Sequence, residues 1–197
     1  VLYKKGDILI DANALPSGVF YITEGIVKRY WIFENGNEIL LNLYKKYAFI
    51  PMSWAIADVP NTHIYAAMTD VSVKKALKDD VLKFLQQEPD IVYDLLRRIF
   101  IGIEGIWSHI ESFSEGNATM KLVASLVILS KRFGKKEKND LIVELKMSEQ
   151  DLATYAGMSR ETVSRELQKL KKEGLVQFAK QTIVITNMKR LEDNLRR

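Results

Sequence analysis

The stretch Gly157 to Leu167, GMSRETVSREL, predicts a helix that begins just after Ser159, a residue type that caps helix N-termini well. Arginines near a helix N-terminus oppose the helix dipole, so Arg160 in the first turn needs another explanation. At about 100° per residue, Val163, Leu167 and Leu170 fall on one face. A second face, well away from the first, carries the polar and charged residues Arg160, Glu161, Ser164, Arg165 and Gln168.

The residues before this stretch predict a second helix that crosses the first. Ser148 is a plausible N-cap with Asp151 in a capping-box position, and Ala153 is small enough for a close crossing. Gly157 permits a tight turn over residues 156–158. A solvated charged face would explain Arg160 but not this spacing, so the pattern favours a helix-turn-helix whose second helix enters the DNA major groove. Arginine can bond guanine N7 and O6, and glutamate can accept from cytosine N4.

A predicted hairpin over residues 176–186 follows the two helices and would form a wing beside the DNA backbone. Lysines here and late in the second helix would neutralise phosphates without reading sequence, although each alone is an ordinary surface charge. The candidate DNA-binding residues are Ser159, Arg160, Glu161, Thr162, Ser164, Arg165, Gln168, Lys169 and Lys180.

The charge of the 197-residue chain is unevenly placed. From Asn117 onward there are 17 Lys and Arg against 10 Asp and Glu, whereas the whole chain has a net charge of +4. This asymmetry indicates that the C-terminal part meets a polyanion. The absence of cysteine excludes disulfides, thiolate metal sites and cysteine-held iron–sulfur clusters. No apolar run is long enough to span a membrane, and no signal peptide is evident, so we expect a cytoplasmic protein without membrane contact.

Residues 1 to about 78 predict short strands separated by turns, as in a β-barrel or sandwich. Gly6-Asp7 marks a turn, Gly25 breaks a strand-forming run, and Asn35-Gly36 predicts a two-residue hairpin. A short helix is expected from Lys78 to Gln87.

A long helix is expected from Pro89 to about Ser114. Its apolar residues follow a 4-3-4-3-4-3 spacing, which is a coiled-coil seam held for three heptads. The seam residues are Val92, Leu96, Ile99, Ile103, Ile106, Ile110 and Phe113. A homodimer is favoured over burial of this helix on its own domain. An apolar helix ended by Gly134, a charged loop at residues 135–140 and a strand at 141–146 come next.

LATYAGMSRETVSRELQKLKKEGLV closely resembles the helix-turn-helix of the Crp/Fnr family of transcription regulators. KKGDIL, VFYITEGIVKRYWIFENGNEI, PDI and QTIVI follow the same family order. The resemblance implies an α+β protein with an N-terminal double-stranded β-helix (jelly-roll-like) at residues 1–88, a long dimerisation helix at 89–115 and a winged helix-turn-helix at 116–197. It also implies a non-enzymatic homodimer on a palindromic operator, with RNA polymerase as a partner. Arg160, Glu161, Ser164 and Arg165 match the family's base-reading positions, which suits TGTGA- or TTGAT-like half-sites containing TGA.

The family's cyclic-nucleotide cassette is altered at residues 47–67, YAFIPMSWAIADVPNTHIYAA. Pro51-Met52 replaces Gly-Glu, and no Arg or Lys lies between Lys46 and Lys74. We therefore expect weak or no binding of cyclic AMP. The segment either packs as core or forms a pocket for a less polar effector, with Phe49, Met52, Trp54, Thr62 and Tyr65 as candidates.

Other functions need residues that this chain lacks. Haem would need a well-placed ligand, and His63 and His109 are better explained as structural or surface residues. A cupin-like metalloenzyme would need several His and carboxylate ligands inside the barrel, where only His63 is available. We expect no metal and no cofactor. A protein-binding module that uses its basic domain for contacts is the remaining alternative.

Overall fold

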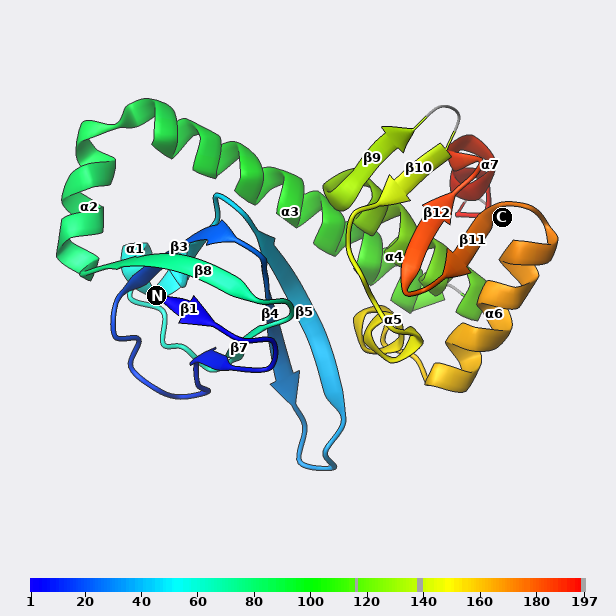
Figure 1. Cartoon of the computed structure of the whole chain (residues 1–197), viewed down its shortest axis with the longest axis horizontal. Coiled ribbons are helices and arrows are strands. Elements are labelled where there is room, and N and C mark those ends of the chain that lie inside the picture. The colour runs from blue at the N-terminus through cyan, green and yellow to red at the C-terminus, as the bar shows by residue number, and fades with distance from the viewer. Residues whose placement is uncertain (116, 138–139, 196–197) are drawn as a thin grey trace. The chain divides into compact units, whose positions relative to one another are not determined.

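The computed structural model describes residues 1–115, 117–137 and 140–195, without the side chains of residues 109 and 112–115. The chain forms two compact units, Val1–Arg97 and Arg98–Arg197. Figure 1 shows the strands of each unit and the long helix α3 (Pro89–Glu115), whose residues are divided between them. The three-part division at residues 1–88, 89–115 and 116–197 stays a prediction.

The first unit contains two four-stranded antiparallel sheets, here called the β-roll. One sheet has the order β1 (Leu2–Tyr3), β8 (Val71–Ala76), β3 (Val19–Glu24) and β6 (Phe49–Ile50). The other has the order β2 (Ile8–Ile10), β7 (Ile64–Ala67), β4 (Ile26–Ile32) and β5 (Glu38–Lys45). Most sheet neighbours are distant in sequence, as in a jelly roll. The short helix α1 (Met52–Ala57), α2 (Lys78–Gln87) and the start of α3 complete the unit.

The β-roll interior is filled from both sheets. Phe20 and Ile22 of β3 pack in one cluster with Val27 of β4 and Tyr65 of β7, each almost fully buried. Removing such side chains from water is the main favourable term in folding, at about 25 cal/mol per Å² of apolar surface. The predicted α+β fold with a jelly-roll-like N-terminal part is confirmed.

The hairpin between β4 and β5 has a longer connection than predicted. The Gly36 amide donates to the Phe33 carbonyl at 2.9 Å, and the Phe33 amide donates to the Asn37 carbonyl at 2.8 Å. The connection is therefore the three residues Glu34 to Gly36, not the two-residue Asn35-Gly36 turn. Gly36, with φ of 79°, occupies the left-handed position that follows a type I turn in such hairpins.

The second unit is a small winged domain. It contains α4 (Ala118–Phe133), β9 (Gly134–Glu137), β10 (Asp140–Val143), α5 (Glu149–Ala156), α6 (Arg160–Lys172), β11 (Val176–Ala179), β12 (Thr182–Ile185) and α7 (Met188–Asp193). The strands form one antiparallel sheet with the order β11-β12-β10-β9. The predicted helices, hairpin and terminal short helix are confirmed.

The expected charged loop at residues 135–140 is wrong at both ends, since residues 135–137 belong to β9 and Asp140 begins β10; residues 138–139 lie outside the described residues. Gly134–Glu137 forms β9, which pairs with β10 so that Lys136 lies opposite Leu141. All four residues of β9 are exposed, so the strand lacks the apolar alternation that would reveal it in the sequence. Lysines on an exposed edge strand discourage pairing with other chains.

In the described part of the chain, no helix has both the length and the apolar character needed to cross a membrane.

Candidate nucleic-acid interface

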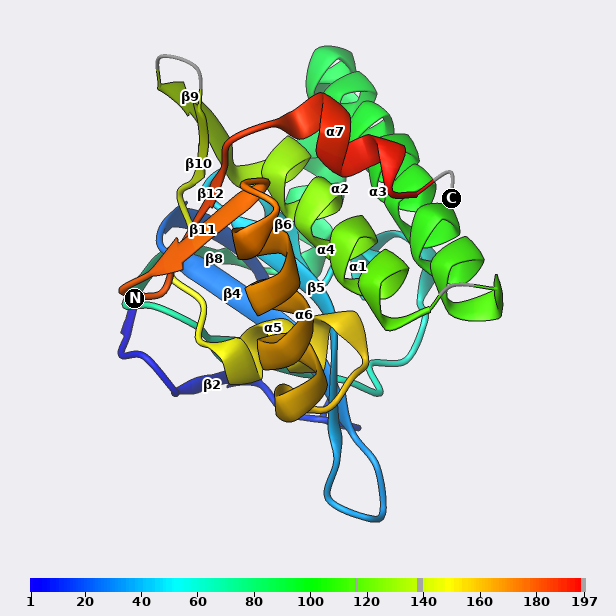
Figure 2. The same ribbon diagram turned by 90° about the vertical axis from the view of Figure 1, so that its right-hand side faces the viewer.

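The turn between α5 and α6 is set by two caps and a glycine. Ser148 and Asp151 form the predicted capping box at the start of α5, and the Ser159 hydroxyl accepts from the Thr162 amide at the start of α6. Gly157 has φ of 59° and ψ of 40°, a left-handed conformation that costs glycine little. Ala153 is fully buried, and Figures 1 and 2 show α5 packed beside α6. The crossing helices of a helix-turn-helix are therefore present.

The two faces of α6 separate as predicted. Val163, Leu167 and Leu170 are buried and hold the helix on its unit. The opposite side has a shallow depression lined by Glu149, Arg160, Glu161, Ser164, Arg165 and Gln168. Glu149 comes from the first turn of α5 and was not among the candidates, because residues on two helices cannot be placed together by spacing along one of them.

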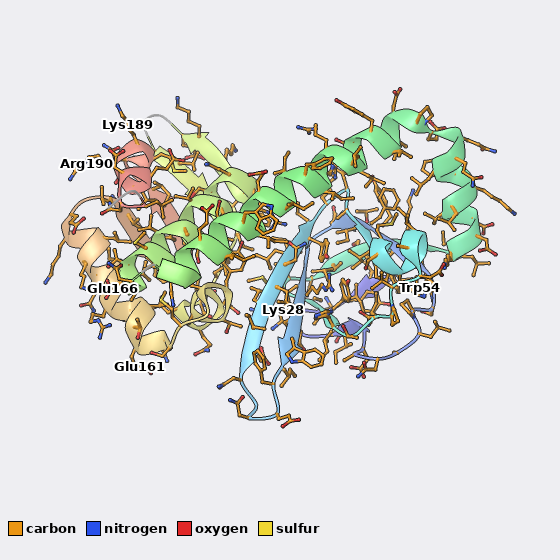
Figure 3. All side chains as sticks on the ribbon, turned by 180° about the vertical axis from the view of Figure 1, so that it is seen from behind. Lys28, Trp54, Glu161, Glu166, Lys189 and Arg190 are labelled. Carbon is orange, nitrogen blue, oxygen red and sulfur yellow. The ribbon has the colours of Figure 1, made fainter. Side chains whose placement is uncertain are left out.

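Glu161 lies at the exposed N-terminal end of α6, where Figure 3 labels it. A backbone hydrogen bond and a hydrogen bond from Ser159 keep its pKa below the ordinary value, and the charge of Arg160 adds to this effect. Glu161 is therefore a carboxylate at neutral pH. A charged acceptor beside arginine donors is suited to base edges, which present both acceptors and donors.

Glu166 is an additional polar residue of α6 that the sequence interpretation missed. Its side chain is only 2% exposed and accepts hydrogen bonds from Thr119 of α4 at 2.7 Å and from Lys169 at 2.9 Å. The Arg165 Nε also donates to it, at 3.2 Å. Burial raises the pKa of Glu166, but the hydrogen bonds from Lys169, Thr119 and Arg165 outweigh it and hold the pKa below its ordinary value. One buried carboxylate thus orients two candidate DNA-binding cations.

The remaining candidate DNA-binding residues lie at the start of α6 and at the tip of the wing. Ser159 and Thr162 lie at the helix start, where their hydroxyls are 3.0 Å apart. Lys180 lies in the two-residue turn of the β11–β12 hairpin, and both Lys180 and Gln181 have positive φ, of 49° and 64°. These angles define a type I′ turn, which suits the twist of a two-stranded wing. The wing places Lys180 at its exposed tip.

The predicted seam of α3 is mostly accessible in the single chain. Val92, Leu96, Ile99, Ile106 and Ile110 are exposed, and Ile103 is half-buried. By contrast, Ile91 and Leu95 pack against the cluster of α2 that contains Val81 and Leu85. The side chains of Phe113 and His109 lie outside the described residues. The start of α3 therefore has one face packed on its unit and another without a covering partner within the described chain.

The five effector-pocket candidates do not gather in one place. Phe49, Met52 and Trp54 pack at the edge of the cluster that contains Val81 and Leu85, and Figure 3 shows Trp54 on the short helix α1. Tyr65 belongs to the separate β-roll interior. Thr62 is exposed and its hydroxyl lies 3.0 Å from His63 Nδ1.

Arg29 of β4 reaches the β-roll interior, and the sequence interpretation did not consider it. Its Nη2 donates to His63 Nδ1 at 2.8 Å, and its guanidinium lies over the Tyr65 ring. Burial lowers the pKa of His63 below its ordinary value, and the Arg29 charge lowers it further. Among the described residues, no group of three or more His, Cys, Asp or Glu could hold a metal ion.

A β-roll followed by a long helix and a winged helix-turn-helix defines a class of DNA-binding transcription regulators. Residues 1–88 match the model of the cyclic nucleotide-binding domain, and residues 120–194 match that of the Crp-like helix-turn-helix domain. The chain belongs to the Crp/Fnr family.

The chain is similar to curated regulators of this family. It is 26% identical to the global nitrogen regulator of Synechocystis over 171 residues, 86% of this chain and 76% of the relative. It is 24% identical to the fumarate and nitrate reduction regulatory protein of Escherichia coli over 184 residues, 93% of this chain and 73% of the relative.

Solved structures share the fold. A variant of CooA from Carboxydothermus hydrogenoformans superposes with a TM-score of 0.83 at 19% identity, covering 99% of this chain and 86% of that one. A CRP/FNR-family regulator from Thermus thermophilus gives a TM-score of 0.76 at 22% identity, covering 100% of this chain and 98% of that one.

Proposed function

We propose that the protein is a homodimer that binds a palindromic operator with TGA-containing half-sites and does so without cyclic AMP. The observation that carries the proposal is the depression at the start of α6, where Arg160, Glu161 and Arg165 stand on a helix whose other face is buried. A helix that enters the major groove reads bases with its N-terminal residues, which is where these side chains lie.

Specific and general contacts come from different residues in this proposal. Arg160 and Arg165 supply bidentate donors for guanine, and Glu161 supplies an acceptor for the amino group of cytosine. Ser164 and Gln168 line the same depression and complete the reading surface. Lys169 and Lys180 contact phosphates, which adds affinity on any sequence and makes binding weaken as salt rises.

The dimer is proposed from the exposed seam of α3. Ile99 and Ile106 are 52% and 58% exposed, and the heptad spacing puts them on one stripe of the helix. Exposed apolar residues in a continuous stripe mark an interaction site, and a second copy supplies an identical stripe. A two-fold dimer in turn requires a two-fold symmetric DNA site.

Independence from cyclic AMP is proposed from the cassette. The segment between β6 and β7 has no cation for a phosphate, and Asn61 there is buried and donates to the carbonyls of Asp11 and His63. The alternative regulator senses a small molecule that is not a nucleotide. RNA polymerase as a partner rests on the family resemblance and stays a prediction, as does the absence of enzymatic activity.

Fluorescence anisotropy with labelled duplexes tests the proposal. One duplex carries TGTGA half-sites in inverted repeat, about 10 bp apart centre to centre, a second carries TTGAT half-sites, and a third has a scrambled sequence. We expect one palindrome to bind roughly 1,000-fold more tightly than the scrambled duplex, equally with and without cyclic AMP. Failure to bind any duplex at low salt would rule out a DNA-binding regulator. A large increase in DNA affinity on adding cyclic AMP would rule out the proposed independence from cyclic AMP.

A further inference from the structure

A row of aromatic side chains runs beside the apolar seam of α3. Tyr93, Phe100 and Trp107 follow one another at intervals of one heptad, and each is more than half exposed in the single chain. In the usual heptad lettering, the spacing of the seam makes Val92 a d residue and Leu96 an a residue, so the aromatic row occupies the e positions. Large apolar side chains that are exposed in a row mark an interaction surface. The a and d residues of the seam do not explain this second row.

Gly102 occupies a g position, on the other flank of the seam. Apart from its neighbours in the chain and the backbone of its own helix, no described atom lies within 4 Å of where a Cβ of Gly102 would be. Its own chain therefore leaves room for a side chain, although glycine destabilises the middle of a helix relative to alanine. Leu95, the preceding g residue, packs instead toward the cluster that contains Val81 and Leu85. Gly102 is thus an open notch on this flank of the single chain.

The notch and the aromatic row would meet across a parallel pair of α3 helices. In such a pair, a g residue lies beside the e residue of the partner's next heptad, and this relation sets Trp107 against the partner's Gly102. In an antiparallel pair, e residues lie beside e residues and g residues beside g residues, which would set ring against ring and notch against notch. The largest side chain of the row therefore meets the smallest residue of the flank only when the two helices run parallel.

The charges that usually choose the partner of a coiled coil are missing from this stretch of α3. Coiled coils select partner and orientation with charged e and g residues. From residue 93 to residue 107, every e and g residue is uncharged. Selectivity must therefore come from shape. A bulky ring in a glycine notch supplies it, because a larger residue at the notch would collide with the ring.

We propose that Trp107 inserts into the notch at Gly102 of a second copy of this chain, so that α3 selects its own copy as partner. The two symmetry-related insertions hold the helices parallel and in one register. The inference rests on the proposed homodimer and deepens it, since the seam accounts for association but not for the choice of partner. A related chain with a large or charged residue at the notch position would be excluded from mixed dimers.

Two variants that each weaken the dimer should prefer each other when they are mixed. Gly102→Leu obstructs the notch and Trp107→Ala empties it, so each variant alone should dimerise at least about tenfold more weakly than the parent. In the mixed dimer, the introduced leucine faces the introduced alanine, and the remaining Trp107 meets the remaining Gly102. Native mass spectrometry of the full chains separates the three dimers by mass. We expect the mixed dimer to exceed the share given by random pairing of equal amounts.

Ile101→Ala is the matched control for Trp107→Ala. The Ile101 side chain is 52% exposed against 56% for Trp107, but it lies at an f position on the outer face of the helix. Mixing Gly102→Leu with Ile101→Ala leaves the introduced leucine against Trp107, so no preference for the mixed dimer is expected. Random pairing of Gly102→Leu with Trp107→Ala would overturn the proposed insertion, as would dimerisation of either variant as tight as that of the parent.

Fluorescence of Trp107 gives a second measurement, which needs no substitution at the notch. With Trp31 and Trp54 replaced by Phe, the emission of Trp107 should move to longer wavelength as the dimer is diluted into monomers. Constant emission through dissociation would place Trp107 outside the interface and overturn the insertion alone. A parent chain that stays monomeric at every concentration would overturn the proposed homodimer together with the insertion, so the two failures can be told apart.

Discussion

The carboxylate of Glu166 accepts a hydrogen bond from the Thr119 hydroxyl at 2.7 Å, and this bond joins the middle of α6 to the first turn of α4. Figure 3 shows Glu166 on α6 beside one end of α4. The same carboxylate receives Lys169 and Arg165, so the packing of α6 and the placement of two proposed DNA contacts depend on one side chain.

Replacing Glu166 with Gln should weaken both functions of the carboxylate. The loss of charge-assisted bonds should lower the free energy of unfolding by about 1–3 kcal/mol. The released Arg165 should also reduce discrimination between palindromic and scrambled DNA, and the released Lys169 should weaken binding to both duplexes. Urea unfolding and anisotropy measure the two effects, with the exposed Glu173→Gln as control. Unchanged discrimination in a folded Glu166→Gln protein would show that Glu166 does not position Arg165, and unchanged affinity for the scrambled duplex would show that it does not position Lys169.

Arg165→Ala should remove sequence preference while leaving the dimer intact. Loss of one bidentate contact per half-site should cost about 1–3 kcal/mol of discrimination for each protomer. Lys180→Gln provides the contrast, since loss of a phosphate contact should weaken binding to every sequence and reduce the salt slope by about one per protomer. If the mutant Arg165→Ala discriminated as well as the parent, the proposed base contact would be wrong.

Ile99→Glu together with Ile106→Glu should give monomers. Both side chains are exposed in the single chain, so the charges should disrupt association without disturbing the packed faces, unlike substitution of the half-buried Ile103. Light scattering after size exclusion gives the mass, and circular dichroism checks the fold. Gln86→Glu together with Gln87→Glu, both exposed at the end of α2, is the control that adds the same charge away from the seam. A dimer mass for the seam variant would locate the interface elsewhere.

Stability should fall as the pH is lowered through the range in which His63 titrates. Burial and Arg29 lower the pKa of His63 in the folded chain, so the unfolded state, with a pKa of about 6.5, binds the proton more readily. The contribution of neutral His63 to the free energy of unfolding is therefore fully present above about pH 6.5. It is lost as the pH falls from that value through the pKa of His63 in the folded chain. His63→Gln keeps an acceptor for Arg29 and should remove this decrease.

Urea unfolding of the parent and His63→Gln at pH 7.5, 6.5 and 5.5 measures the difference, and the contribution of His109 cancels because both proteins contain it. An NMR titration of the imidazole gives its pKa directly. Parallel pH profiles, or an ordinary pKa for His63, would contradict the prediction.

Local patterns in the sequence predicted the fold well where periodicity and capping act within a few residues. The caps Ser148 and Ser159, the turn at Gly157 and the apolar face of α6 all follow from short-range chemistry. β9 was missed because an exposed strand of charged residues has no alternation of apolar and polar residues. Its strand conformation depends instead on its pairing with β10. The Asn35-Gly36 signal found the hairpin but not the length of its connection.

The sequence predicted the candidate DNA-binding residues that share one face of α6. It did not predict the contacts that residues make between different elements. The reading surface of α6 follows from a rotation of about 100° per residue, but Glu149 joins it only through the crossing of α5. Glu166 looked like one more surface charge, and its burial depends on α4. Arg29 is 34 positions from His63, and only the pairing of β4 with β7 brings the two together.

At the wing tip, the residues that would make the turn most stable differ from the lysine that would contact DNA. Lys180 and Gln181 both adopt left-handed backbone conformations, each of which costs an ordinary side chain about 1–2 kcal/mol relative to the right-handed region. Asn-Gly is the pair that such a turn favours, so a more stable hairpin is available to this chain at the cost of its lysine. An engineered wing with Asn-Gly should therefore resist heating better than the natural one and hold DNA less firmly.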